Sequence, residues 1–285
     1  GKTLKLQAAD PSVATTQGKA LARCGDVPIV VVHHYGQGAA IYLNLEIGAY
    51  CYDRLQAGSG TSLPGLVEGM LRIVEIEPRV RVLGEDGKRL PGTEVVIFKN
   101  GGCEHVAVFR NPQFDDGGWR DFPTMKAPGW AGSIDNSLLE QEASVTIQWR
   151  KELRTYDIRK KQDLGVLRIH KATMGPWEPL VFTRSAQQIP KLNLSVASQA
   201  EAGSQCEITL RNASALPGKT CRVVHLELET PASQVCDLYT RNLLMNSQSH
   251  VERVPLALND PKGRWRLRAC DLLTGHVEEA SFQVI

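Results

Sequence analysis

Residues 221–229 read CRVVHLELE, and the apolar side chains in this stretch recur at every second position. Val224, Leu226 and Leu228 share one parity, whereas His225 and Glu227 share the other. A period of two is that of a half-buried β-strand, because successive side chains point to opposite faces of a sheet. The stretch therefore predicts a strand with an apolar inner face and a polar outer face.

The same alternation returns throughout residues 186–285, with turn residues between the short runs. Such a series of short strands is typical of an antiparallel, immunoglobulin-like β-sandwich. The Cys, Trp, Cys spacing of antibody domains is absent, so we predict the architecture alone. The other side chains expected to face the core are Leu192, Leu194, Val196, Cys206, Ile208, Leu210, Trp265, Leu267, Ala269, Phe282 and Val284.

Residues 79–185 are expected to form a β-rich middle domain. The turn Asn100-Gly101-Gly102 separates the runs EVVIF and HVAVF, which predicts a hairpin within a β-meander. Further on, Val145, Ile147 and Trp149 alternate with polar residues. Residues 111–137 are rich in Gly, Pro and Asp and have no period, so they predict a long surface loop.

Residues 1–78 predict a small α/β part. Residues 28–44 read PIVVVHHYGQGAAIYLN, in which two apolar runs flank a tight turn, so we expect a strand, a turn and a second strand. Ser62 offers an N-cap for an amphipathic helix that ends before Pro78. The expected fold is therefore mainly β with a small α/β part, in three domains. The apolar side chains at helical spacing are Leu63, Leu66, Val67, Met70, Leu71 and Val74.

Charge and hydropathy exclude several classes of partner. The chain of 285 residues has 33 Lys and Arg against 31 Asp and Glu, a formal charge of +2, which provides no strong field toward nucleic acid or an anionic membrane. No apolar run approaches the roughly 18 residues of a membrane-spanning helix. We therefore expect neither a nucleic-acid partner nor a membrane span.

The seven cysteines give no sign of a metal site. They include no C-x-x-C pair, and no histidines stand at zinc-ligand spacing, so we expect no metal and no cofactor. Cys206 shares the parity of Ile208, whereas Cys221 lies opposite in parity to Val224. The two thiols are expected to face different ways, which argues against a disulfide between them.

No catalytic motif stands out. Gly36-Gln37-Gly38 lacks the third glycine of a dinucleotide loop and precedes a strand, and His33 and His34 are expected to point to opposite faces. The sequence contains no G-x-S-x-G, no H-E-x-x-H and no phosphate loop. We therefore expect that the chain is not itself an enzyme.

Two groups of residues are candidate carbohydrate sites. Asp115 and Asp116 lie near Trp119 and Trp130 in the long loop, where the rings could stack on a sugar and the carboxylates accept its hydroxyls. The alternative is ordinary turn chemistry, with tryptophans that fill an interface. Asn193 and Asn212 begin two N-x-S sequons, which are either glycosylation sites or chance occurrences.

Several phrases carry a resemblance to a known family. The segment 35–44, YGQGAAIYLN, with the helix around Met70, resembles the last strands and helix of the trimerisation domain of microbial β-galactosidases, which has an amidotransferase-like α/β fold. The resemblance implies an amidotransferase-like remnant at residues 1–78 and a non-catalytic role. Neither the catalytic barrel nor a Cys/His/Glu triad has a counterpart, so no catalytic residue carries over. The phrases that resemble the β-rich tails of large glycosidase-like proteins from environmental bacteria are YDIR at 156–159, LG at 164–165, HLEL at 225–228, YTRN at 239–242, LALNDPKGRW at 256–265 and DLLTG at 271–275.

These observations predict a non-catalytic structural or assembly region of a bacterial glycosidase-like protein that mediates self-association. The expected partner is a second copy of the chain, in a closed oligomer or an open-ended assembly. Two alternatives remain: a carbohydrate-binding module that uses the Trp119 and Trp130 loop, and a secreted self-assembling structural protein. The chain begins at Gly1 without an initiator Met or a signal peptide, so we expect Gly1 to lie inside a larger protein. We expect an extracellular or cell-surface location, with the cytoplasm as the alternative.

Overall fold

The computed structural model describes residues 9–45, 63–90, 92–110 and 140–285. This part of the chain is mainly β, with several sheets and one α-helix. The expectation of a mainly β fold is therefore confirmed. The chain divides into two compact units. The first comprises Gly1–Thr93, Arg110–Arg150 and Lys171–Trp177, and the second comprises Glu94–Phe109, Lys151–His170 and Glu178–Ile285.

The first unit contains a three-stranded antiparallel sheet and the helix. The strands β1 (Lys19–Cys24), β2 (Val27–Tyr35) and β3 (Gly38–Leu43) lie in chain order, and Tyr35 pairs with Gly38 at the hairpin. The helix α2 (Leu63–Ile73) packs through Met70, Leu66 and Val67 on a small core that includes Ile29 and Val30. The predicted hairpin and amphipathic helix are both confirmed.

A second pair of strands in this unit follows the helix. Strand β4 (Val80–Leu83) pairs with the first part of β7 (Ala143–Asp157), where Val82 is opposite Ile147. Val145, Ile147 and Trp149 are all buried, as their alternation predicts, because they share one face of the strand.

In the second unit, the last part of β7 continues a sheet with the strand order β7, β9, β6, β5. The strands are β9 (Leu180–Ser185), β6 (Cys103–Arg110) and β5 (Thr93–Asn100), and β8 (Gln162–Met174) pairs with β7. The hairpin turn at Asn100 is confirmed. The expectation of a meander is wrong, because β4 pairs with β7 and not with the next strand β5, and β9 lies between β6 and β7. Alternation predicts which face a residue occupies but not which strand lies alongside.

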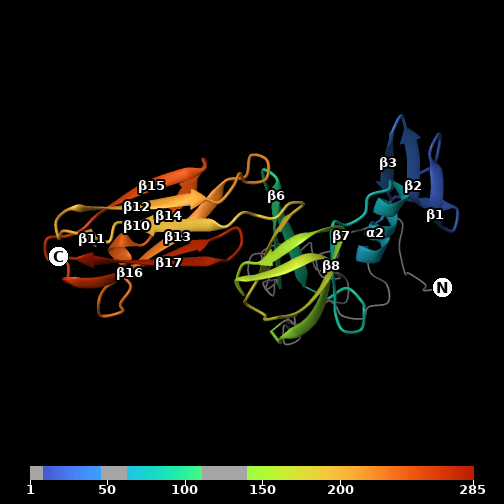
Figure 1. Cartoon of the computed structure of the whole chain (residues 1–285). Helices are drawn as coiled ribbons and strands as arrows, with labels where there is room; N and C mark the ends of the chain where they lie inside the picture. Colours follow the sequence, from blue (N-terminus) through green and yellow to red (C-terminus); the bar gives the residue numbers. More distant parts are fainter. Residues whose placement is uncertain (1–8, 46–62, 91, 111–139) are drawn as a thin grey trace. The chain divides into compact units, whose positions relative to one another are not determined.

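The rest of the second unit is a sandwich of two sheets (Figure 1). One sheet has the order β10 (Leu192–Val196), β12 (Gln205–Asn212), β15 (Ser249–Pro255). The other has the order β11 (Gln199–Ala200), β17 (Val277–Val284), β16 (Gly263–Asp271), β13 (Arg222–Glu229), β14 (Arg241–Met245). A short 3-10 turn, η2 (Asp237–Tyr239), follows β13.

Both sheets share one hydrophobic core. Every side chain that the alternation placed inside belongs to it, and only Leu194 and Val196 are partly exposed. Trp265 is fully buried, with its ring centre 6.0 Å from that of Tyr239 and 6.3 Å from that of Phe282. Its indole Nε1 donates to the carbonyl of Pro261 at 2.9 Å, so the polar atom of this large side chain is satisfied.

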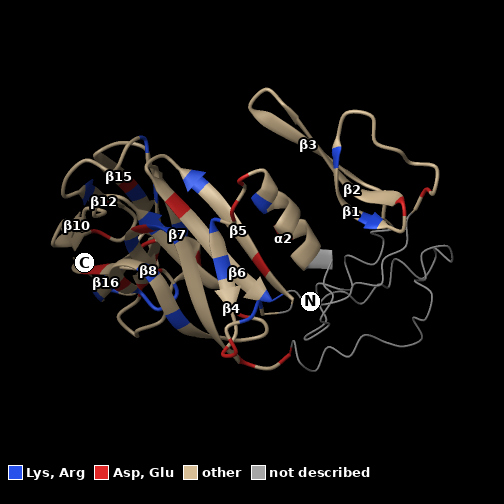
Figure 2. Ribbon diagram, turned by 90° about the vertical axis from the view of Figure 1, so that its right-hand side faces the viewer, with Lys and Arg blue, Asp and Glu red and all other residues tan. Residues whose placement is uncertain are grey.

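Basic and acidic positions are interspersed along the strands, in keeping with the small net charge (Figure 2). Among the helices of the described residues, none is long and apolar enough to span a membrane.

The sandwich core predicts the effect of truncating Leu226. This side chain is fully buried, so we expect Leu226→Ala to lower the free energy of unfolding by about 2–5 kcal/mol through lost burial and a residual cavity. Thermal and urea denaturation followed by circular dichroism would measure it. The control Leu244→Ala removes a side chain that is 54% exposed and should change stability by less than about 0.5 kcal/mol. Equal losses for the two variants would contradict the described packing.

Candidate functional site: a buried polar junction

A group of buried polar side chains in the second unit lies where the sheet containing β6 meets the sandwich. A glycine turn makes the first contact. Gly102 N donates to Pro217 O at 3.1 Å and to Thr220 Oγ1 at 3.0 Å. The Asn100 side chain bonds the backbone of Cys221 twice, donating to its carbonyl at 2.8 Å and accepting from its N–H at 2.9 Å. The hairpin is thereby fixed to the start of β13.

Glycine is required in this turn because the two backbones touch. Gly101 has φ of +58°, and a Cβ placed there would collide with the backbone nitrogen of Thr220. A Cβ at Gly102 would lie 2.7 Å from the carbonyl oxygen of Pro217. Close backbone approach and positive φ are the two conditions that select glycine.

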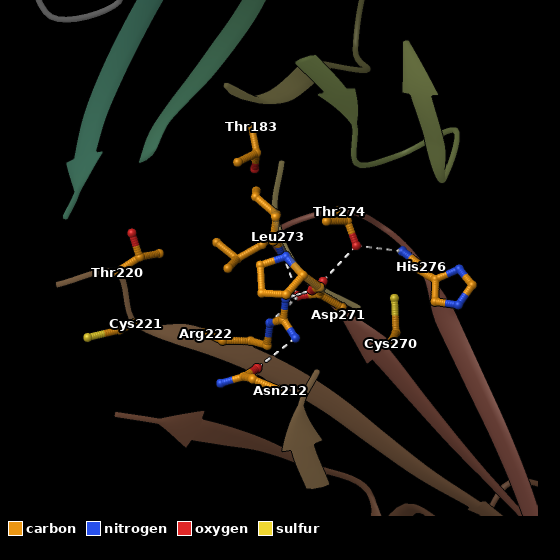
Figure 3. Close-up of polar contacts among 12 residues, drawn as sticks. Thr183, Asn212, Thr220, Cys221, Arg222, Cys270, Asp271, Leu273, Thr274 and His276 are labelled. Atoms are coloured by element: carbon orange, nitrogen blue, oxygen red, sulfur yellow. Dashed lines mark hydrogen bonds and ion pairs between the residues drawn. The ribbon is translucent and has the colours of Figure 1, made fainter. Parts of the chain in front are cut away.

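A buried ion pair lies beneath this contact (Figure 3). Arg222 and Asp271 are 0% and 1% exposed, and Arg222 Nε lies 3.4 Å from Asp271 Oδ1. The guanidinium also donates to Asn212 Oδ1 at 2.7 Å and to the carbonyl of Pro190 at 2.5 Å. Burial lowers the pKa of Arg222 while Asp271 opposes this, and an arginine remains charged at physiological pH. The pair therefore holds two charges in the interior, each with several partners.

The carboxylate of Asp271 also shapes the turn that follows β16. Its Oδ1 accepts from Leu273 N at 2.9 Å, and its Oδ2 accepts from Thr274 Oγ1 at 2.6 Å. This turn lies against the turn between β7 and β8: a Cβ at Gly275 would be 2.8 Å from the carbonyl oxygen of Ile158. One acid thus links the buried arginine to a second contact between the sheets.

An apolar cluster fills the space between these polar contacts. Cys103, Tyr156, Ile189 and Leu273 are all buried in it, and the Tyr156 hydroxyl accepts from Ile189 N at 3.1 Å. Burial raises the pKa of Cys103 and of Tyr156, which keeps both groups protonated.

A second buried arginine lies in the sheet itself. Arg184 on β9 is 2% exposed and donates to Glu104 Oε1 at 3.0 Å and to the Lys151 carbonyl at 2.6 Å. Beside it, His105 Nδ1 lies 2.9 Å from Thr183 Oγ1, and burial lowers the pKa of this histidine. These environments favour a neutral histidine and protonated thiols, so the cluster suits packing better than proton transfer.

The cysteines of the described ranges form no disulfide, and Cys206 is buried while Cys221 is only partly so. Burial raises the pKa of Cys206 to about 11. Within those ranges no group of three or more His, Cys, Asp or Glu residues could hold a metal ion. His33 is half-buried and His34 exposed, in keeping with their opposite parity.

Of the sequence-predicted site residues, Asp115, Asp116, Trp119 and Trp130 lie outside the described residues. Asn193 is exposed on β10. Asn212 is 2% exposed, and its Nδ2, the atom that would carry a glycan, donates to Ser247 O at 3.2 Å. A glycan at Asn212 would therefore require this buried side chain to become exposed.

The ion pair matches no sequence motif, but the parity of its two residues in their strands does indicate it. Arg222 has the inward parity of Val224, and Asp271 has that of Ala269, while Val224 pairs with Asp271 across the two strands. Two opposite charges at inward positions near the same end of neighbouring strands indicate a buried pair. The phrases 156–159 and 271–275 also meet at this junction.

Comparisons with known proteins give only weak similarity. No family model matches the chain, and no curated protein does. Two solved structures of a β-glucosidase from Listeria innocua, one with laminaribiose and one with isofagomine, are each 13% identical with a TM-score of 0.23, over 34% and 33% of this chain. A calcium-binding mutant of β-glucuronidase 2 from Bacteroides uniformis is 10% identical with a TM-score of 0.21 over 73% of this chain. The matches span only 16%, 16% and 32% of those chains.

The buried ion pair predicts a large cost when one partner is neutralised. In Asp271→Asn, Arg222 would keep its charge in the interior without a counter-ion, so we expect a loss of about 3–5 kcal/mol of stability. The control Glu207→Gln removes the acid of an exposed pair with Arg253 and should cost less than about 1 kcal/mol. Urea titration of both variants would measure the difference, and similar losses would show that the pair is not buried as described.

The glycine contact predicts a position-specific effect of a single methyl group. Gly165 also has positive φ, but a Cβ there meets nothing within 4 Å, so Gly165→Ala should cost only the left-handed backbone penalty of about 1–2 kcal/mol. Gly101→Ala adds a collision with backbone and should cost at least about 1 kcal/mol more. Thermal denaturation of the two variants side by side would show this, and an equal cost would mean that the hairpin is not held against residues 217–220.

Proposed function

We propose that this chain is a non-catalytic structural region of a glycosidase-like protein and that it associates with a second copy of itself. In this proposal the sandwich is immunoglobulin-like, residues 1–78 are an amidotransferase-like remnant, and the domain boundaries lie near residues 78 and 185. Two of the phrases that resemble glycosidase tails, 156–159 and 271–275, are in contact at the buried junction, which supports a structural role for them. The observation that carries self-association is the edge of β3, along which the described residues place no further strand.

Strand β3 has the features of an edge that pairs readily. Its six residues, GAAIYL, include no charge and no proline, and its register with β2 is regular. Among the described residues, β3 pairs with β2 alone. Tyr42 is 52% exposed on this strand. An apolar edge of this kind presents unpaired backbone groups to which another strand can add.

Two other edges, β1 and β15, carry features that hinder pairing. On the opposite edge of the same sheet, β1 has Lys19 and Arg23 and two irregularities in register. In the sandwich, Glu252 on β15 shares the inward parity of Val254 and forms a 2.7 Å ion pair with Arg241 on β14. Charges, irregular register and inward-pointing charged residues are the means by which proteins protect edge strands. The contrast with these two edges supports β3 as an edge to which another strand can add.

A second copy of the chain fits this edge better than an unrelated strand of high charge. An uncharged strand can pair antiparallel with itself without placing like charges opposite one another. A two-fold axis would then use the same surface on both copies and join two three-stranded sheets into one.

The edge predicts that a charge at Tyr42 weakens self-association. We expect the unmodified chain to sediment as a dimer at tens of micromolar, and Tyr42→Lys to raise the dissociation constant at least about tenfold by bringing two like charges together. The control is Tyr35→Lys, at the hairpin end, where the side chain is 84% exposed. Analytical ultracentrifugation measures both, with circular dichroism to check the fold. A monomer at about 100 μM, a concentration at which a dimer of ordinary affinity would form, would overturn the proposal.

A further inference from the structure

The outer face of the five-stranded sheet carries a row of arginines. Arg264, Arg266 and Arg268 alternate along β16 with the core residues Trp265 and Leu267, so the three guanidinium groups lie on the outer face. By register, Arg268 is opposite Glu227 on β13 and Glu279 on β17, and Arg266 is opposite Glu229 and Ser281.

The acids on this face are shared unequally among the three arginines. Arg268 lies within 4 Å of three carboxylates, at 3.0 Å from Glu227, 3.4 Å from Glu279 and 3.8 Å from Glu229. Arg266 has one such partner, Glu229 at 3.3 Å. Arg264 has no carboxylate within 4.0 Å in the part of the chain that the structure describes. Its Nε and Nη2 donate instead to the Ser281 hydroxyl at 3.2 and 3.0 Å, and the neighbouring Lys262 is exposed. One end of the row is therefore a cation without a counter-ion.

A groove of about 460 Å³ lies at this end of the row. Its volume is within the range of roughly 300–1,000 Å³ of small-molecule sites. Arginine, glutamate, serine and threonine side chains provide its polar lining. The residues around it are Glu229, Thr230, Pro231, Ser233, Arg264, Trp265, Arg266, Glu279, Ala280 and Ser281.

The wall of the groove is held in place by its own contacts. Thr230 N donates to Gln234 O at 2.8 Å, and Ser233 N donates to Thr230 O at 2.9 Å. Pro231 lies against Gly263, where an added Cβ would be 3.0 Å from the proline ring. A groove with a fixed wall requires little ordering when a ligand binds, which favours affinity.

The lining combines two kinds of recognition. The Arg264 guanidinium and the Ser281 hydroxyl suit an anionic oxygen group, because a guanidinium offers parallel N–H donors to such a group. Glu229 and Glu279 accept hydrogen bonds and would repel a second anion, so they suit hydroxyl donors. A molecule with one anionic group and several hydroxyls satisfies both ends.

We propose that this groove is a binding site for an acidic saccharide, whose carboxylate lies on Arg264 and whose hydroxyls donate to Glu229 and Glu279. This site is independent of self-association through β3, because the two belong to different units of the chain. Its lining includes none of the candidate residues of the 111–137 segment.

Isothermal titration calorimetry with galacturonyl-galactose, which carries a single carboxylate, the matched neutral galactose disaccharide and inorganic sulfate tests the proposal. We expect galacturonyl-galactose to bind with a dissociation constant below about 1 mM and at least tenfold more tightly than the other two, since only it offers both chemistries. Arg264→Gln should weaken that binding at least about tenfold, because it removes the guanidinium while leaving the core intact. The matched control is Arg253→Gln, an exposed arginine on the other sheet of the sandwich, which should bind as the unmodified chain does.

Each other outcome overturns the proposal. No heat of binding with galacturonyl-galactose up to about 10 mM would show that the groove is not an acidic-saccharide site. Sulfate that binds as tightly as galacturonyl-galactose would show a simple anion site. Equal binding of the neutral disaccharide, or unchanged binding by Arg264→Gln, would show that the cation takes no part. Thermal denaturation of both variants checks that each is folded.

Discussion

A guanidinium group inside a protein must be given both a negative charge and hydrogen-bond acceptors, and this constraint organises the second unit. Arg222 finds its charge in Asp271 and its acceptors in Asn212 and the Pro190 carbonyl. These partners come from three other parts of the chain, so the side chain brings together the end of β12, the start of β13 and the end of β16. The turn after β16 and the connector before β10 are held at the same point. The apolar core provides most of the gain from burial.

The sequence predicted the faces of strands well and their neighbours poorly. Alternation of Val224, Leu226 and Leu228 is enough to place them in the core, because a sheet with one buried face allows only one orientation of the strand. The helix around Met70 was equally well predicted from the helical spacing of its apolar residues. The position of β9 between β6 and β7 could not be predicted from the sequence, because strand pairing depends on contacts between segments that are far apart in the chain.

At the junction, too, the sequence predicts local structure but not the contacts between segments that are far apart in the chain. Gly101 and Gly102 are visible in the sequence as a turn, but their contact with Pro217 and Thr220 depends on the fold of the whole unit. The parity of Arg222 and Asp271 could have revealed a buried pair, whereas Arg184 gave no comparable motif. The candidate residues between 111 and 137 lie outside the described part, so for them the sequence remains the only source.

Because Cys206 is buried in the sandwich, the reactivity of its thiol depends on how often the sandwich opens. The side chain is 2% exposed and burial raises its pKa to about 11, so the thiol is both covered and protonated in the folded unit. A thiol-specific reagent needs an exposed thiolate, and it can reach this sulfur only in molecules whose sheets have separated. The rate at which Cys206 reacts therefore reports how often the sandwich opens under native conditions, without denaturant.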